Sequence, residues 1–404
     1  MEKCLSDYGI RFVFSDFIEN KLFCISFKKF AGLYEMNLDN DEIKCLGELP
    51  IEYQCVFNHP TEYVVLKHIR NEIIIAPYMS DGDLIIYNLD TGVFKKIKLA
   101  QKVFNKKTCG EVISNVFSFG DSLYFVANHV GIIVEYDSAS KIITYHEDWF
   151  DNVASEIGIA SIATTLQGIE QSKNYVYMAI RDENKILRID PATHSVEMFS
   201  MPYEFHAYGI RYDGNFFWIS SIYGESVTKW DPIEMTFQRN FLPTSLNPAY
   251  QAVGISDQYV FLFPCLESRF FAIDRRDNAL VQIKILEDML KKMEHNPNPN
   301  EYPGKYIAVL SHNGKIYALM NDTRLQEIDI CTGKVNLHTQ KLNRLHDEDI
   351  RIRSNIWRGK MIYTEEPGLG LSVFLKNILN ANEFQNIGRK TDIGERILKE
   401  AIRG

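Results

Sequence analysis

The sequence predicts an all-β protein built as a ring of four-stranded antiparallel sheets, the β-propeller architecture. The main observation is a recurring step in which an apolar residue precedes Asn or Asp and a short polar turn follows. Successive steps lie 41 to 55 residues apart, close to the length of one four-stranded blade. The chain also has 25 Phe and 21 Tyr, concentrated with Val and Ile in short runs typical of strands. The seven steps are Met36-Asn37, Tyr87-Asn88, Tyr136-Asp137, Ile189-Asp190, Trp230-Asp231, Ile273-Asp274 and Ile328-Asp329.

The fifth unit shows the expected order of elements within a blade. Residues 208–212 form its first predicted strand, and Asp213-Gly214 is expected to make a two-residue turn because both positions tolerate positive φ. The second, third and outer strands are then expected at 215–220, 226–230 and 236–239.

Other units repeat this register. Asn313-Gly314 and Gly120-Asp121 each precede an apolar strand and predict tight hairpins. Gly-Ile pairs at Gly168, Gly209 and Gly254 mark the innermost strands, where small residues suit close backbone packing near the axis. The Asn or Asp of each step is interpreted as a turn residue, since carboxylates spread around a ring do not converge on one metal ion.

Seven blades are favoured, and eight remain an alternative. The segments 350–356 and 360–364 read as a further hairpin, but no Asn/Asp step follows them. We expect residues near the N-terminus to pair with this hairpin and so hide the edge strands of the ring.

Two segments depart from the strand pattern. Residues 285–293 have helical spacing and predict a short inserted helix, which the prolines after it would end. After about residue 371 the pattern becomes helical, and residues 392–402 carry an apolar stripe. We therefore predict a propeller at 1–370 and a helical C-terminal extension at 371–404.

Composition limits the class of protein. A net charge of -9 disfavours general binding to nucleic acids or anionic membranes. The seven cysteines are scattered without C-x-x-C spacing, so neither a disulfide framework nor a zinc site is indicated. The N-terminus lacks a signal-peptide pattern, and no apolar run has the length of a membrane span. We expect a cytoplasmic, bacterial protein.

The strand and turn signatures carry a resemblance to known proteins. The x-Asp-Gly-x-aromatic-aromatic strands and apolar-Asp-x-x-Thr-Gly turns, over roughly residues 8 to 365, resemble the bacterial propeller group that includes kelch-like, YncE-like and streptogramin-lyase-like proteins. The resemblance implies the fold. It also implies that an enzyme of the lyase type would place a general base on the ligand face.

The loops between second and third strands share one face of the predicted disc with the connections between blades, and ligands commonly bind there. These loops have no common pattern, which favours a surface diversified for recognition. The predicted binding residues on this face are Tyr78, Asn128, His129, Arg181, Asp182, Tyr223 and Glu267.

His129 and His206 are the candidate catalytic residues, because a loop histidine could act as a general base. A lone loop histidine is more commonly an ordinary surface residue. No serine-hydrolase elbow, zinc-protease helix, phosphate loop or EF-hand spacing occurs in the sequence. No metal ligands are assigned and no cofactor is expected; the alternative is a divalent cation in the channel.

The segment 146–151 pairs acidic residues with Trp149 and Phe150 between the third and fourth units. It is interpreted as an aromatic plug, with a partner-binding or sugar-binding loop as the alternative.

The predicted function is non-catalytic recognition or scaffolding, with a protein, peptide or glycan partner held on the loop-rich face. One alternative is a metal-assisted propeller enzyme of lyase or lactonase type, using His129, His206 and a carboxylate. The other is a structural subunit of a larger assembly. The sequence does not identify the partner or the oligomeric state.

Overall fold

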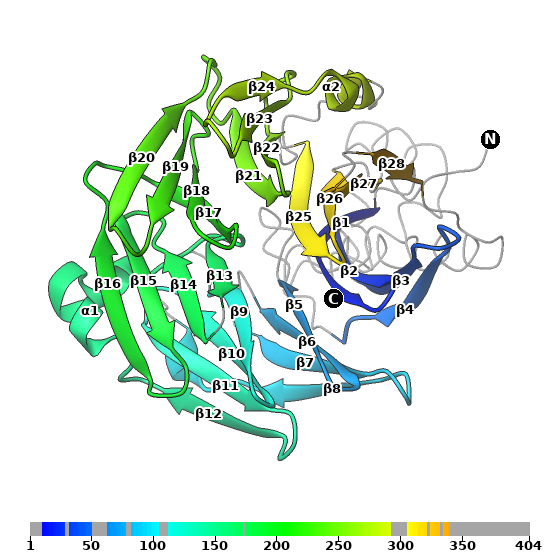
Figure 1. Cartoon of the computed structure of the whole chain (residues 1–404). Coiled ribbons are helices and arrows are strands. Elements are labelled where there is room, and N and C mark those ends of the chain that lie inside the picture. Colours follow the sequence, from blue (N-terminus) through cyan, green and yellow to red (C-terminus); the bar gives the residue numbers. More distant parts are fainter. Residues whose placement is uncertain are drawn as a thin grey trace, which may run out of the picture. The chain divides into compact units, whose positions relative to one another are not determined.

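The computed structural model of the protein describes residues 10–28, 32–50, 63–77, 82–104, 112–172, 174–291, 305–320, 324–331 and 334–339. These residues form seven four-stranded antiparallel sheets, and in each sheet four consecutive strands pair in chain order. The innermost strands surround a common centre (Figure 1). The predicted β-propeller is therefore confirmed.

Each blade runs from its innermost to its outermost strand. Blades 1 and 2 comprise β1 (Ile10–Ile18), β2 (Lys21–Lys28), β3 (Gly32–Asn37), β4 (Ile43–Glu48), β5 (Tyr63–Ile69), β6 (Glu72–Pro77), β7 (Asp83–Asn88) and β8 (Val93–Lys98). Blades 3 and 4 comprise β9 (Ile113–Phe119), β10 (Ser122–Ala127), β11 (Ile132–Asp137), β12 (Ile142–His146), β13 (Ile169–Ser172), β14 (Tyr175–Ala179), β15 (Lys185–Asp190) and β16 (Ser195–Ser200).

The other three blades follow the same plan. Blades 5 and 6 comprise β17 (Ala207–Tyr212), β18 (Phe217–Ser221), β19 (Ser226–Asp231), β20 (Thr236–Phe241), β21 (Tyr250–Ile255), β22 (Tyr259–Pro264), β23 (Phe271–Asp274) and β24 (Leu280–Gln282). Blade 7 comprises β25 (Tyr306–His312), β26 (Lys315–Met320), β27 (Leu325–Asp329) and β28 (Val335–His338).

The seven Asn or Asp residues of the recurring step all end the third strand of a blade. In every blade the side-chain oxygen of this residue accepts a hydrogen bond from the backbone N–H two residues later, over 2.7 to 3.1 Å. This is the local turn that Asn and Asp favour. The interpretation as turn residues is confirmed.

Two of the predicted hairpins have the expected two-residue turns. His312 pairs with Lys315 across Asn313 and Gly314, whose φ angles are 46° and 71°. Phe119 pairs with Ser122 across Gly120 and Asp121 in the same way.

The prediction of a two-residue turn at Asp213-Gly214 is wrong. Tyr212 pairs with Phe217, so the turn spans the four residues 213–216. The Asp213 carboxylate accepts hydrogen bonds from the N–H groups of Asn215 and Phe216, at 2.9 and 2.8 Å. These contacts hold both residues in the turn and start the second strand two residues later than expected.

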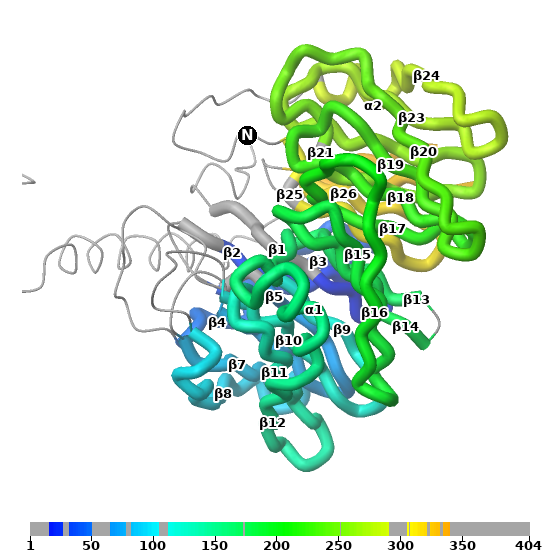
Figure 2. The backbone as a smooth tube through the Cα atoms, turned by 90° about the vertical axis from the view of Figure 1, so that its left-hand side faces the viewer, coloured from blue at the N-terminus to red at the C-terminus, as the bar shows by residue number. Residues whose placement is uncertain are grey.

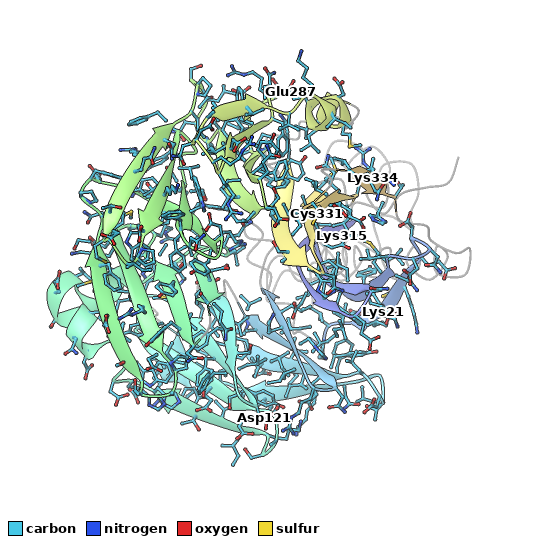
Figure 3. All side chains as sticks on the ribbon, viewed as in Figure 1. Lys21, Asp121, Glu287, Lys315, Cys331 and Lys334 are labelled. Atoms are coloured by element: carbon cyan, nitrogen blue, oxygen red, sulfur yellow. The ribbon has the colours of Figure 1, made fainter. Side chains whose placement is uncertain are left out.

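The core lies between neighbouring blades. Every residue of β6, β10 and β18 is buried, so these second strands are covered on both faces. Five apolar clusters each combine side chains from two consecutive blades, from blades 2 and 3 through blades 6 and 7. Side chains fill the space between adjacent sheets (Figure 3). A blade is thus stabilised mainly by its neighbours.

Glycines at the inner strands lie in close contact with neighbouring groups. A Cβ at Gly168 would lie 1.8 Å from Thr164 Oγ1, and one at Gly254 would lie 3.0 Å from the Ile316 side chain. Both positions exclude a larger residue without local movement.

The ring closes where blade 7 meets blade 1. Strand β1 contacts both β5 and β25, so no further blade lies between the last described blade and the first. The rings of Phe17 and His312 stack at 4.4 Å across this joint. The His338 Nδ1 atom lies 2.6 Å from Asp41 Oδ1, and its Nε2 atom lies 3.1 Å from Glu327 Oε2. Seven blades therefore complete the ring.

Two α-helices of the described residues extend the blades. The predicted helix at 285–293 is present as α2 (Lys284–Lys291), and it contributes Leu286 and Leu290 to the core between blades 6 and 7. The sequence interpretation missed α1 (Asp151–Ile157), which packs against β16 (Figure 2). Short 3₁₀ helices occupy Gln101–Val103 and Ile159–Ser161.

The segment before α1 behaves as the predicted plug. Trp149 and Phe150 are buried in the cluster between blades 3 and 4. The Trp149 ring also stacks on His194 at a centroid distance of 4.4 Å. Both aromatic residues are therefore packed within the fold, as the plug interpretation requires.

Several expectations concern residues outside the described ranges. They are the hairpin at 350–364 and its pairing with the N-terminus, the boundary at residue 370, and the helical extension with its apolar stripe at 392–402. Among the described residues, no helix has the length and apolar character needed to cross a membrane. The four cysteines within these ranges, Cys24, Cys45, Cys265 and Cys331, are not in disulfide bonds.

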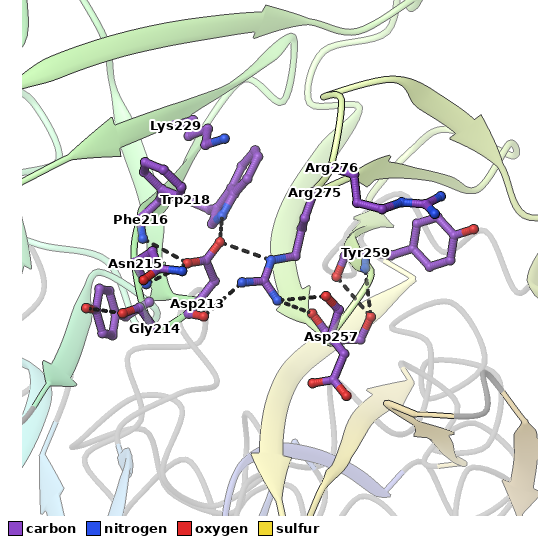
Figure 4. Close-up of polar contacts among 12 residues, drawn as sticks. Asp213, Gly214, Asn215, Phe216, Trp218, Lys229, Asp257, Tyr259, Arg275 and Arg276 are labelled. Atoms are coloured by element: carbon purple, nitrogen blue, oxygen red, sulfur yellow. Dashed lines mark hydrogen bonds and ion pairs between the residues drawn. The ribbon is translucent and has the colours of Figure 1, made fainter.

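A charged contact joins blades 5 and 6 on the face that carries the turns between first and second strands (Figure 4). The Arg275 Nε atom lies 3.1 Å from Asp213 Oδ2, and its Nη1 donates to the carbonyls of Ser256 and Asp257. Only 1% of the Asp213 side chain is exposed. Burial raises the pKa of Asp213, but the Trp218 N–H, the turn amides and Arg275 together lower it below its usual value.

Replacing Asp213 by Ala should lower the free energy of unfolding by about 3 kcal/mol, because Arg275, the Trp218 N–H and two turn amides all lose the buried carboxylate that they contact. Urea denaturation monitored by tryptophan fluorescence measures this change. Asp231→Ala is the matched control, since Asp231 makes only turn hydrogen bonds and should cost about 1 kcal/mol. Equal losses in the two variants would contradict the assigned role of the buried pair.

Candidate functional site

The predicted binding residues that fall in the described ranges lie on the face that carries the loops between second and third strands. The structure divides those in the described ranges into two groups. Asn128, His129 and Arg181 contact the connection between blades 3 and 4. Tyr223 and Glu267 follow the second strands of blades 5 and 6, and the candidate catalytic residue His206 comes just before the first strand of blade 5. Tyr78 lies outside the described residues.

Asn128 is buried and holds the blade 3 loop in place. Its Oδ1 accepts a hydrogen bond from the Ser114 hydroxyl at 3.0 Å and from the Thr164 N–H at 3.3 Å. Its side-chain amide donates to the Thr164 carbonyl at 3.4 Å. These contacts give Asn128 a structural role and leave it little surface for a ligand.

His129 likewise makes hydrogen bonds to the connection between blades 3 and 4. It has a positive φ of 63°, and its N–H donates to the Ile162 carbonyl at 2.7 Å. The ring Nδ1 atom lies 2.7 Å from the carbonyl oxygen of Ala160, so Nδ1 is the protonated ring nitrogen. The ring is thereby oriented by the connection between blades 3 and 4.

Arg181 and Asp182 form a local ion pair on the next blade. The Arg181 Nε and Nη2 atoms lie 3.1 and 3.0 Å from Asp182 Oδ2. The Arg181 N–H donates to the Ala163 carbonyl at 2.9 Å. Asp182 is exposed, so its carboxylate is the more accessible of the two groups.

His206 and Tyr223 come together at the start of blade 5. Their ring centroids lie 5.2 Å apart in an edge-to-face arrangement, and the His206 Nε2 atom is 3.4 Å from the exposed Glu204 carboxylate. Tyr223 is 44% exposed. This pair presents an aromatic surface to solvent.

Glu267 is buried, and its carboxylate is hydrogen-bonded within its own loop. Its carboxylate accepts hydrogen bonds from Arg269 Nη2 at 2.9 Å and from the Ser268 N–H at 2.9 Å. The Arg269 hydrogen bond is the main reason that the pKa of Glu267 falls to about 2, although burial opposes it. Lys305 donates to the Glu267 carbonyl. Glu267 therefore stabilises its loop.

No group of three or more His, Cys, Asp or Glu side chains within the described ranges is arranged to hold a metal ion. His129 and His206 belong to the separate groups described above.

The sequence interpretation missed an exposed apolar surface beside His206 and Tyr223. We call Tyr223, Phe241, Leu246 and Leu266 the blade 5–6 patch; the last three are 70%, 42% and 37% exposed. Backbone hydrogen bonds connect the segments that carry them, from Leu242 to Glu225, from Ala249 to Tyr223 and from Leu266 to Pro248. Three segments thus present apolar side chains on the same face.

An arginine reinforces the patch. The Arg239 guanidinium lies 4.8 Å from the centroid of the Phe241 ring, and its Nη2 atom lies 3.0 Å from Glu225 Oε1. Arg239 also stacks on Tyr203 and Phe205 from the connection between blades 4 and 5. Arg239 therefore connects Phe241 of the patch to Glu225 and to the connection between blades 4 and 5.

A second feature that sequence reasoning missed is a central cavity of about 340 Å³, lined by the innermost strands of six blades. Two charged pairs lie in its wall, Asp16 with Lys67 at 3.2 Å and Glu170 with Arg211 at 3.8 Å. The strand positions of these residues follow from the repeat, but their convergence requires knowledge of the ring.

No protein-family model matches the sequence, and no curated protein matches it. Solved structures are similar in fold. A catalytically inactive virginiamycin B lyase from Staphylococcus aureus, solved with quinupristin, has a TM-score of 0.58 and 14% identity, over 81% of this chain and 97% of that chain. A streptogramin B lyase has a TM-score of 0.55 and 13% identity, over 83% and 97%.

YCF48 bound to D1 peptide is also similar, with a TM-score of 0.55 and 12% identity over 79% of this chain and 91% of that chain. At such identities the likeness establishes the fold alone. The expected resemblance to streptogramin-lyase-like propellers is confirmed at that level.

The environment of Glu267 predicts acid sensitivity. Because its pKa in the folded protein lies below its usual value, its contribution to stability is present at neutral pH and is lost as the pH falls from about 4.5 towards 2. Glu267→Gln should therefore be less stable than wild type at pH 7, and this difference should shrink at pH 3. Urea unfolding at both pH values measures it.

Glu234→Gln, a change of an exposed turn residue, is the control for the acid-sensitivity measurement and should unfold like wild type at each pH. A stability difference for Glu267→Gln that is the same at pH 3 and pH 7 would contradict the prediction.

Proposed function

We propose that this protein is a non-catalytic recognition or scaffold module that binds a protein, peptide or glycan partner through its loop-rich face. The observation that carries the proposal is the blade 5–6 patch. Aromatic residues and arginine are the residue types enriched at protein interfaces, and exposed apolar groups are commonly interaction sites. Among the three partner classes, this composition favours a protein or peptide.

The geometry of the patch supports binding. Arg239 is held between Glu225 and the aromatic rings, so little side-chain freedom remains to be lost when a partner docks. The charges of Arg239 and Arg269 are each paired with a carboxylate, Glu225 and Glu267. A partner segment with an apolar anchor would therefore meet a surface that is already ordered and charge-balanced.

The predicted catalytic residues add little support to an enzyme. His129 has one ring nitrogen engaged by a carbonyl, and His206 lies beside Tyr223. The recognition proposal includes no cofactor. Magnesium, manganese and calcium are accordingly expected to leave the melting temperature unchanged, whereas a metal-assisted lyase or lactonase would be stabilised by its ion.

The double variant Tyr223→Ser with Phe241→Ser should weaken partner binding by about tenfold or more, because truncating central aromatic anchors commonly costs over 1 kcal/mol each. Affinity capture from a bacterial lysate with quantitative mass spectrometry identifies the partner. Titration of the purified partner then gives the dissociation constants.

The matched control for the patch variant is Ile233→Ser, which removes an 83% exposed apolar side chain from a turn on the opposite face. It should bind like wild type, and all variants should keep the wild-type melting temperature. Equal binding by the patch variant and the control would refute the proposed surface.

A further inference from the structure

The central cavity carries a chemical pattern that the recognition surface does not use. It is lined by residues of β1, β5, β9, β13, β17 and β25, whose positions around the centre are visible in Figure 1. Its volume of about 340 Å³ corresponds to on the order of ten water molecules, at about 30 Å³ each. That space also fits a small molecule with about a dozen non-hydrogen atoms.

The Arg211 guanidinium donates hydrogen bonds to backbone carbonyls around the cavity. Its Nη1 donates to Ile210 at 2.8 Å and to Gln167 at 3.4 Å, and its Nη2 donates to Val309 of blade 7 at 3.3 Å. Its approach to Glu170 is longer, at 3.8 Å. The guanidinium therefore balances the charge of Glu170 without occupying its oxygens at hydrogen-bond distance.

Glu170 consequently keeps hydrogen-bond capacity. A carboxylate can accept about four hydrogen bonds. The groups that favour the ionised form of Glu170 are the Tyr212 N–H, which donates a hydrogen bond, and the more distant charge of Arg211. Burial outweighs both and raises the pKa of Glu170. Its side chain is 24% exposed and lines the cavity. A donor group inside the cavity would satisfy these oxygens.

The wall around Glu170 has no net charge. Asp16 pairs with Lys67 at 3.2 Å and accepts the His68 N–H at 2.9 Å, so this second carboxylate is compensated. With Glu170 and Arg211, the charged residues that line the cavity are two anions and two cations. An ammonium would lie close to the Arg211 charge, and an anion would lie close to Glu170. A neutral ligand avoids both the repulsion between like charges and the loss of solvation of a buried ion.

The rest of the lining supplies both donors and acceptors. The polar residues Ser118, Ser311, Asn115, Gln167 and Gln171 also line the cavity. The Gln171 amide donates to the Ser118 carbonyl at 2.8 Å. A ligand suited to such a wall both donates and accepts hydrogen bonds at several atoms.

We infer that the central cavity binds a neutral polyhydroxylated molecule of about the size of one monosaccharide, with a hydroxyl group donating to Glu170. This site is separate from the blade 5–6 patch and does not depend on the proposed recognition function. The hydroxyl groups of such a molecule serve as donors to Glu170 and as acceptors for the side-chain donors of the wall.

The test uses the full chain and two neutral probes, D-glucose and myo-inositol, with saturation-transfer NMR and calorimetry. At least one probe should bind saturably, and Glu170→Gln should weaken it at least about tenfold, as expected for loss of a hydrogen bond to a charged group. Glucosamine and glucuronate, which carry a charge, should bind more weakly than the neutral probe.

The matched control is Glu197→Gln, which changes a mostly exposed carboxylate paired with Arg188 in the same blade. This variant and the Tyr223→Ser, Phe241→Ser double variant should bind the probe like wild type. Loss of the polyol site with intact partner binding, or the reverse, separates the two proposals.

A second measurement does not depend on whether Glu170→Gln folds. Wild-type affinity for the neutral probe should fall as the pH is lowered, because a protonated Glu170 accepts hydrogen bonds less well. The inference is overturned if neither neutral probe binds saturably, if Glu170→Gln binds like wild type, if a charged probe binds more tightly, or if the affinity is independent of pH.

Discussion

The second strand of a blade is buried on both faces of its sheet, and that constraint accounts for the ring. The second strands β6, β10 and β18 are buried throughout, so a blade with only one neighbour would expose half of its core. A closed ring gives every blade two neighbours. The contact of β1 with β25 completes that arrangement. The cavity at the centre and the loop-rich face are both consequences of this closure.

The fold was predictable because its signals are local. The Asn or Asp of each step makes its turn through the backbone of the next residues, so the step marks the end of the third strand in all seven blades. The length of the turn at Asp213 was not predictable, because it depends on side-chain hydrogen bonds to Asn215 and Phe216. Helix α1 was missed because its seven residues follow an aromatic segment that was interpreted only as a plug.

For the candidate site, the sequence predicted the face of the propeller on which the residues lie, but not their contacts or burial. Sequence reasoning placed Asn128 and Glu267 on the correct loops, but their partners, Thr164 and Arg269, decide that both are buried. Phe241 is the last residue of an outer strand, and no sequence feature distinguishes it from a core residue. The Glu170 and Arg211 pair combines residues from two blades, and Arg211 reaches a third through Val309. Such combinations depend on the three-dimensional arrangement of the strands.

The joint between the first and last blades has a consequence for how the chain can reach its native state. Each described blade is made of consecutive strands, and the contacts across this joint are side-chain contacts such as Phe17 with His312 and His338 with Asp41. Sheets could therefore form one after another during synthesis on the ribosome. The flank of the first blade that faces the seventh would stay uncovered until the seventh blade had formed, so closure of the ring couples the two blades that are farthest apart in the chain.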